Sequence, residues 1–142
     1  MLTCTKPGKE DNRSLSRGPV QIIAFTSPES YNQDHRIAAF SAHASARPQP
    51  KGAKHFVETV ISYEEPADGW TLMKNPDPNF FVELSESNLA AKENAVSLYK
   101  SQDRPAPSVR SQETIRALSR LRGSQCGVGL AEGYCAYRIS GK

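Results

Sequence analysis

Residues 20–47, VQIIAFTSPESYNQDHRIAAFSAHASAR, carry the pattern that decides the fold class. The run from Val20 to Phe25 is short, apolar and rich in β-branched residues, which predicts a buried strand. After a polar turn, Ile37, Phe40 and Ala44 recur at intervals of three and four, and this spacing predicts a helix that ends before Pro48. The segment therefore begins an α/β unit.

The rest of the chain alternates between strand and helix patterns in the same way. Runs of β-branched and aromatic residues predict strands at residues 56–63, 80–84 and 134–137. Ser85 or Ser87 can cap a helix of about 15 residues that carries Leu89 on its apolar face, and Ser111 can cap another that stops at Gly123. The predicted order is strand, helix, strand, strand, helix, helix, strand, so we expect an α/β fold whose sheet lies between helices.

The folded part of the chain is expected to be incomplete. Residues 1–18 mix charged residues, serine, glycine and proline with little apolar periodicity, and we interpret them as a disordered or non-native tail. Residues 19–140 form the folded part. Only one strand precedes the first helix there, whereas an open α/β sheet usually begins with several strand–helix units. The sheet would thus be narrow, with exposed edges.

Composition argues against several classes of protein. No run approaches the roughly 18 apolar residues that a membrane helix needs, and the first residues lack the apolar stretch of a signal peptide. The 18 basic and 15 acidic residues are scattered, which argues against a nucleic-acid surface. Three cysteines, Cys4, Cys126 and Cys135, cannot all pair, and none stands in a C-x-x-C motif. We expect a cytoplasmic protein with neither a membrane nor a nucleic-acid partner.

Short motifs from residue 25 to residue 138 follow one another in an order that is more informative than any of them alone. NQDHR at 32–36 follows the first strand, and YE at 63–64 follows the second. PNFFVEL at 78–84 forms the third strand, Lys92 precedes YKSQ at 99–102, and RS, RG and AE stand at 110–111, 122–123 and 131–132. In order and spacing these motifs resemble the carboxy-terminal half of the zinc-dependent LmbE/PIG-L N-deacetylases.

The resemblance implies a Rossmann-like three-layer sandwich and a zinc ion. In that family a His and an Asp of an amino-terminal HPDDE motif bind the zinc together with a later histidine, and the enzyme removes acetyl groups from N-acetylglucosamine-type conjugates. This sequence contains no HPDDE motif. We therefore expect an enzyme fragment that is inactive alone. Its expected partners are the amino-sugar conjugate and either the missing amino-terminal half or a second copy of the chain.

The resemblance also implies roles for residues in and beside the NQDHR motif. His35 stands at the position of the later zinc ligand, and neutral imidazole is a good zinc donor. Asn32 stands where many members carry a second histidine; its amide can polarise a carbonyl, but its alternative role is an Asx-turn. Asp34 is a second catalytic candidate that could orient a ring nitrogen or simply favour the helix dipole. Tyr31 and Arg36 are candidate substrate-binding residues, with a solvated surface role as the alternative.

A different class of function remains open at this point. The chain could be a non-catalytic α/β remnant that acts as a binding or scaffold module. We expect Lys92, Arg110 and Arg122 to be structural ion-pair partners, and Cys135 to be a plain buried thiol. His43 lies roughly 80° around the helix from His35, so it offers no second ligand on the same face.

Overall fold

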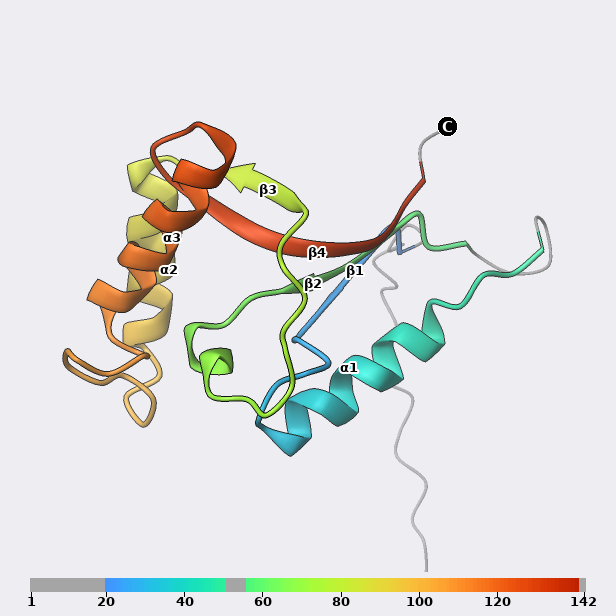
Figure 1. Cartoon of the computed structure of the whole chain (residues 1–142), viewed down its shortest axis with the longest axis horizontal. Helices are drawn as coiled ribbons and strands as arrows, with labels where there is room; N and C mark the ends of the chain where they lie inside the picture. Colours follow the sequence, from blue (N-terminus) through green and yellow to red (C-terminus); the bar gives the residue numbers. More distant parts are fainter. Residues whose placement is uncertain (1–19, 51–55, 141–142) are drawn as a thin grey trace, which may run out of the picture.

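The computed structural model describes residues 20–50 and 56–140, and the tail predicted at residues 1–18 lies outside this part. It has a mixed α/β fold (Figure 1), with the elements β1 (Ile22–Phe25), α1 (Gln33–Ser45), β2 (Thr59–Tyr63), the 3-10 helix η1 (Pro66–Gly69), β3 (Phe80–Glu83), α2 (Glu86–Ser97), α3 (Gln112–Cys126) and β4 (Ala131–Ile139). The predicted order of strands and α-helices is confirmed.

The four strands form one mixed sheet in the order β1-β2-β4-β3. β1 and β2 are parallel, with Ile23 opposite Val60, and are joined through α1. β4 runs antiparallel to both of its neighbours and pairs with β2 along one part of its length and with β3 along another. β4 is therefore longer than the strand predicted at residues 134–137. The parallel pairing brings the carboxyl ends of β1 and β2 to the same edge of the sheet.

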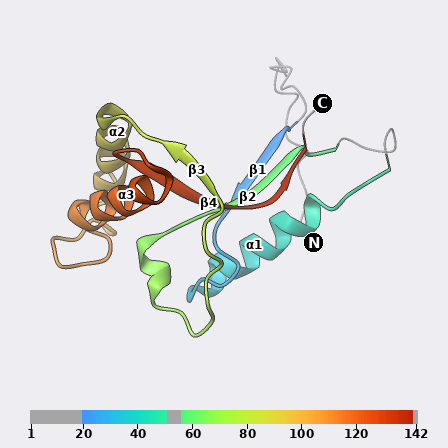
Figure 2. The ribbon, with the colours of Figure 1, turned by 45° about the horizontal axis from the view of Figure 1, so that its top comes forward.

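The helices cover the two ends of the sheet (Figures 1 and 2). α1 lies along β1 and β2, whereas α2 and α3 lie together beside β3. Two small apolar clusters hold these parts together. One contains Phe25, Ala39, Ala46 and Val60, and the other contains Leu89, Ile115 and Leu130. Each helix group thus has its own core, and the sheet connects the two.

The α1 helix packs on a face that its apolar spacing did not identify. Ile37 and Phe40, which predicted the helix, are 66% and 59% exposed, whereas Ala39 is fully buried. Ala42 and Ala46 join Ala39 in the cluster beneath the helix. These alanines have no bulk beyond Cβ, so they allow the helix backbone to approach the sheet closely, and the two larger side chains point away from it.

The α3 helix ends later than its glycine pattern predicted. Ser111 caps its start as expected, accepting a hydrogen bond from the Thr114 N–H, but the helix continues past Gly123 to Cys126. Gly127, with φ of 81°, occupies the left-handed position that follows the last turn. Gly123 has a packing role instead, because a Cβ there would lie 2.7 Å from the Val128 carbonyl oxygen.

This close approach predicts that Gly123→Ala destabilises the protein. The added methyl group would meet backbone atoms, which cannot rotate away, so we expect the free energy of unfolding in urea to fall by about 1–3 kcal/mol. Gly129→Ala is the matched control, since a Cβ at Gly129 meets no atom within 4 Å. Equal stability of the two variants would contradict the assignment of Gly123 to packing.

Candidate functional site

The loops that follow β1 and β2 frame one side of a pocket of about 930 Å³. Asn32 and His35 reach it from the start of α1, and Glu65 reaches it from the loop after β2. Side chains of α2, α3 and β4 and of the loop between α2 and α3 line the rest, including Lys92, Gln102, Arg110, Arg122, Glu132 and Tyr134. The pocket therefore lies between the start of α1 and the loop after β2 on one side and the α2–α3 pair with β4 on the other.

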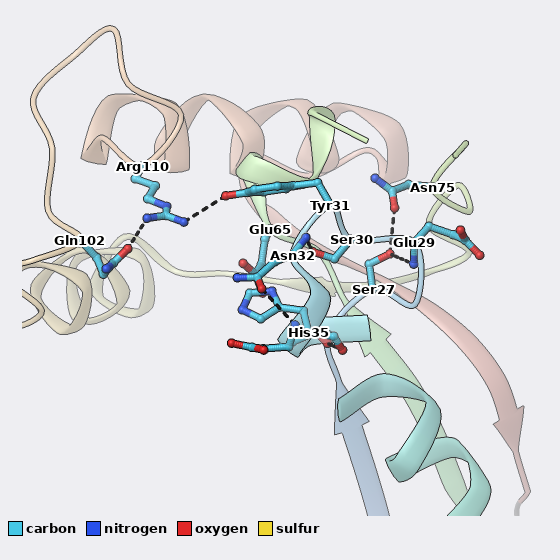
Figure 3. Close-up of polar contacts among 12 residues, drawn as sticks. Ser27, Glu29, Ser30, Tyr31, Asn32, His35, Glu65, Asn75, Gln102 and Arg110 are labelled. Atoms are coloured by element: carbon cyan, nitrogen blue, oxygen red, sulfur yellow. Dashed lines mark hydrogen bonds and ion pairs between the residues drawn. The ribbon is translucent and has the colours of Figure 1, made fainter. Parts of the chain in front are cut away.

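Short polar contacts tie the two loops together at the sheet edge. The Ser27 hydroxyl donates a hydrogen bond to Asn75 Oδ1 at 2.8 Å, and the Asn75 amide donates to the Asp68 carbonyl at 2.7 Å. Thr71 adds a bond from its hydroxyl to the Glu29 carbonyl at 2.6 Å. Figure 3 shows the Ser27–Asn75 contact beside the start of α1. These bonds fix the loop after β2 against the loop after β1.

Asn32 is the N-cap of α1. Its side-chain oxygen accepts a hydrogen bond from the Asp34 N–H at 3.1 Å, and its own N–H donates to the Ser30 hydroxyl at 3.2 Å. The Asx-turn predicted for Asn32 is thus present. Its side-chain amide nitrogen makes no hydrogen bond within residues 20–50 and 56–140, so this donor is available in the pocket.

His35 lies in the first turn of α1, with its ring against Glu65. The Thr26 hydroxyl donates to the His35 carbonyl at 2.8 Å, and His35 Nδ1 lies 3.3 Å from Glu65 Oε1. The distance between His35 Nδ1 and Glu65 Oε1 is that of an ion pair, but the two atoms are not aligned for a hydrogen bond. Nδ1 is buried and makes no hydrogen bond among the described residues. The arrangement points Nδ1 toward a carboxylate, and Nε2 makes no hydrogen bond or ion pair in the described part of the chain (Figure 3).

Glu65 and Asp68 place two carboxylates close to this histidine. Burial raises the pKa of Glu65, the Asp68 charge raises it further, and the charges of His35 and Arg110 oppose the shift. Asp68 is 3% exposed, and neither of its carboxylate oxygens has a hydrogen-bond partner in the described residues. Neither residue was singled out from the sequence. For Glu65, the signal was its position just beyond the carboxyl end of the second strand.

Two of the three basic residues expected to be structural form ion pairs. Lys92 Nζ lies 2.5 Å from Glu132 Oε1, and Arg122 pairs with Glu64. Burial alone would raise the pKa of Glu132, but hydrogen bonds from Lys92 and Tyr134 outweigh it and hold that pKa below its ordinary value of 4.5. These pairs anchor α2 to β4 and α3 to the loop after β2.

Arg110 differs from the other two, because its guanidinium donates to the neutral acceptors Gln102 Oε1 and Tyr31 Oη. Tyr31 thereby lies at the rim of the pocket through its contact with Arg110 (Figure 3). Asp34 and Arg36 are exposed and do not line the pocket. Of the five residues proposed from the NQDHR region, Asn32 and His35 therefore lie in the pocket and Tyr31 lies beside it.

Within residues 20–50 and 56–140, no three His, Cys, Asp or Glu side chains come together in a way that could hold a metal ion. In the same residues, none of the helices has the length and apolar character needed to cross a bilayer. No family model matches the chain, and neither does any curated protein at a significant level.

The lowered pKa predicts that Glu132 stabilises the fold only while it is ionised. The contribution of Glu132 to stability should be present above about pH 4.5 and lost as the pH falls through the lower pKa that Glu132 has in the folded state. We expect Glu132→Gln to reduce the free energy of unfolding at pH 7 by about 1 kcal/mol, because partial exposure screens the pair. The deficit should shrink as the pH falls below about 4.5.

Chemical denaturation across this pH range tests the prediction. Glu83→Gln, at an exposed position on β3, serves as the control and should leave stability unchanged at every pH. A deficit in Glu132→Gln that stays constant down to pH 3 would show that the carboxylate charge is not its cause.

Proposed function

We propose that the folded part of this chain is the carboxy-terminal part of a zinc-dependent N-deacetylase domain of the LmbE/PIG-L type, and that His35 is its zinc ligand. The contact between His35 Nδ1 and Glu65 is the observation that carries the proposal. Histidines that bind metals usually direct the second ring nitrogen to a carboxylate or carbonyl, which fixes the ring and raises the basicity of the ligating nitrogen. Glu65 is the carboxylate that lies 3.3 Å from His35 Nδ1, and it would act in this way once that contact is aligned for a hydrogen bond.

The described residues alone do not fit a zinc ion. Catalytic zinc sites normally use three protein ligands, and here one imidazole is the only candidate ligand assigned by the resemblance. The other two ligands would come from an HPDDE motif, which the 142-residue sequence lacks. When bound, zinc would lower the pKa of a water molecule and polarise the acetyl carbonyl. The role of this chain is accordingly to position His35 and the groups around it.

Asn32 has a second part in the proposal. Its oxygen is occupied as the N-cap of α1, so the geometry leaves its amide NH₂ to donate to a developing oxyanion. An amide does not release a proton near neutral pH, so this residue would polarise the substrate and would not protonate the leaving amine. Asp34, which lies outside the pocket, has no role in this scheme.

The surface around β1 supports an α/β domain larger than the described part. β1 pairs on one side with β2, and none of the other described strands pairs with it on the opposite side. Ile22 on this strand is 60% exposed, and Ile37 and Phe40 are exposed on the face of α1 that points away from the sheet. Further parallel strands and helices, as in a Rossmann-like three-layer sandwich, would cover these groups. The β1–α1–β2 unit is the repeat from which such a sheet is built.

A non-catalytic binding or scaffold module is the second candidate. It is favoured by the absence of the HPDDE motif from the sequence, because the chain by itself lacks most of the ligands that the reaction requires. The nucleotide sequence upstream of the chain separates the two candidates at little cost, since a segment encoding HPDDE there, in any frame, would indicate a divided or interrupted enzyme gene.

Zinc analysis of the chain, alone and joined to an amino-terminal segment that carries HPDDE, tests the enzyme proposal. After dialysis we expect much less than one zinc per molecule for the chain alone and about one for the joined protein. In the joined protein, His35→Ala should abolish zinc retention and deacetylation of N-acetylglucosamine conjugates. Glu65→Gln should weaken zinc binding by about 10–100-fold.

His43→Ala is the matched control on the same helix. The His43 ring contacts Phe25 and Tyr137 and not the pocket, so this variant should keep its zinc. Stoichiometric, His35-dependent zinc in the chain alone would contradict the half-site proposal. Retention of zinc by the joined His35→Ala protein would remove its main support.

Two substitutions at Asn32 separate its structural role from its chemical role. Asp is as good an N-cap as Asn, so Asn32→Asp should preserve α1 while removing the amide donor. We expect turnover of the joined protein to fall by roughly 100-fold in both Asn32→Asp and Asn32→Ala, with zinc retained. Only Asn32→Ala should also lose about 1 kcal/mol of stability. Normal turnover in Asn32→Asp would show that Asn32 merely holds the loop.

A further inference from the structure

The basic side chains that line the pocket differ in whether a carboxylate pairs with them. Lys92 and Arg122 form ion pairs with Glu132 and Glu64, so their charges are compensated. Glu65, the remaining carboxylate near the rim, lies against His35 at 3.3 Å. Arg110 has no ion pair within residues 20–50 and 56–140. It is therefore the pocket guanidinium whose charge is left without a bonded carboxylate.

Arg110 is nevertheless held in place. Its Nη1 donates to Gln102 Oε1 and its Nη2 donates to Tyr31 Oη at 3.3 Å. Its backbone N–H donates to the Ser108 hydroxyl at 3.2 Å, in the turn that leads into α3. Figure 3 shows the guanidinium between Gln102 and Tyr31, on the same side of the site as Asn32, His35 and Glu65. Two segments, the loop between α2 and α3 and the distant segment that carries Tyr31, thus converge on the Arg110 side chain.

The partners of Arg110 matter because both are uncharged. A hydrogen-bonded carboxylate would orient the guanidinium and also neutralise it, whereas an amide oxygen and a phenol oxygen only orient it. The carboxylate that senses the Arg110 charge is Glu65, which makes no hydrogen bond or ion pair with Arg110 in the described residues. A guanidinium has five N–H donors, and the two contacts use only part of them. The planar fork matches the oxygens of a phosphate or a carboxylate. Because the protein already holds the Arg110 side chain in one orientation, less conformational entropy of that side chain is lost when a ligand binds.

We propose that Arg110, positioned by Gln102 and Tyr31, forms an anion-binding subsite at the rim of the pocket, for a phosphate or carboxylate group of a small-molecule ligand. Anion binding itself follows from the charge and the contacts of Arg110. The subsite is inferred from this geometry alone and does not depend on the proposed deacetylase function. Tyr31 is then a positioning residue for Arg110.

Titration of the full chain with inorganic phosphate and, separately, with acetate tests the subsite by ¹⁵N NMR at low ionic strength. We expect saturable shifts of the Arg110 Nε–H and the Gln102 carboxamide, with a dissociation constant on the order of millimolar for ions this small. Arg110→Gln should weaken binding at least about tenfold, and Tyr31→Phe should weaken it by a smaller factor. Tighter binding of phosphate would identify a phosphate-bearing ligand, and tighter or equal binding of acetate a carboxylate-bearing one.

Arg104→Gln is the control, because this exposed arginine lies in the same loop and its guanidinium donates only to the carbonyl of Asp103. It should bind phosphate as the unmodified chain does, and amide shifts elsewhere report whether each variant is folded. Arg110→Lys, which keeps the charge but loses the fork, provides a second variant and should bind with intermediate affinity.

Two results would overturn the subsite. One is a set of linear, unsaturated shifts spread over all the arginines. The other is unchanged binding in a folded Arg110→Gln or Arg110→Lys protein. The titration requires neither zinc nor deacetylation, so its failure would leave the zinc proposal standing, and a failed zinc experiment would leave the anion site standing.

Discussion

The parallel pairing of β1 with β2 is the constraint on which the rest of the structure depends. It aligns Phe25 with Ser62 at the ends of the two strands, so that both following loops begin at the same edge of the sheet. His35 and Glu65 then meet, although they lie on different loops and far apart in the sequence. The crossover helix α1 is fixed by the same pairing, because its alanine face packs on both strands. The meeting of His35 with Glu65 and the position of α1 thus both follow from this βαβ unit.

Charge compensation divides the polar residues of the pocket into two groups. The pairs Lys92–Glu132 and Arg122–Glu64 join helices to neighbouring strands and loops, and their charges are satisfied within the fold. His35 and Arg110 are held by contacts that leave a ring nitrogen or a net charge available. Both side chains are only partly buried, and their contacts leave donor or acceptor groups that a ligand in the pocket can reach. Proximity to the pocket alone would not have separated the groups.

The uncovered surfaces of β1 and α1 connect the fold to the proposed function. The backbone groups on the open side of β1 can pair with another strand. Covering the exposed apolar side chains of Ile22 and Phe40 would also remove apolar surface from water, which is favourable. The candidate ligand His35 lies near the carboxyl end of β1, where the Thr26 hydroxyl donates to its carbonyl. A partner segment that extends the sheet at β1 would therefore bring its own loop residues to the same end of the pocket, which is where a zinc site shared between two segments would form.

The sequence by itself determined the elements and their order, because periodicity and capping are local properties. Ser111 caps α3 as predicted, and Asn32 forms the Asx-turn that was one of its two alternative roles. The sequence did not determine which face of α1 is buried, where α3 ends, or which charges are compensated. Gly123 resembles a helix stop until the carbonyl of Val128 is seen to pack against it. Arg110 resembles an ordinary ion-pair partner until Gln102 and Tyr31 are brought to it. Only the tertiary structure decided these points, because each depends on which atoms come into contact after folding, and neither periodicity nor capping specifies those contacts.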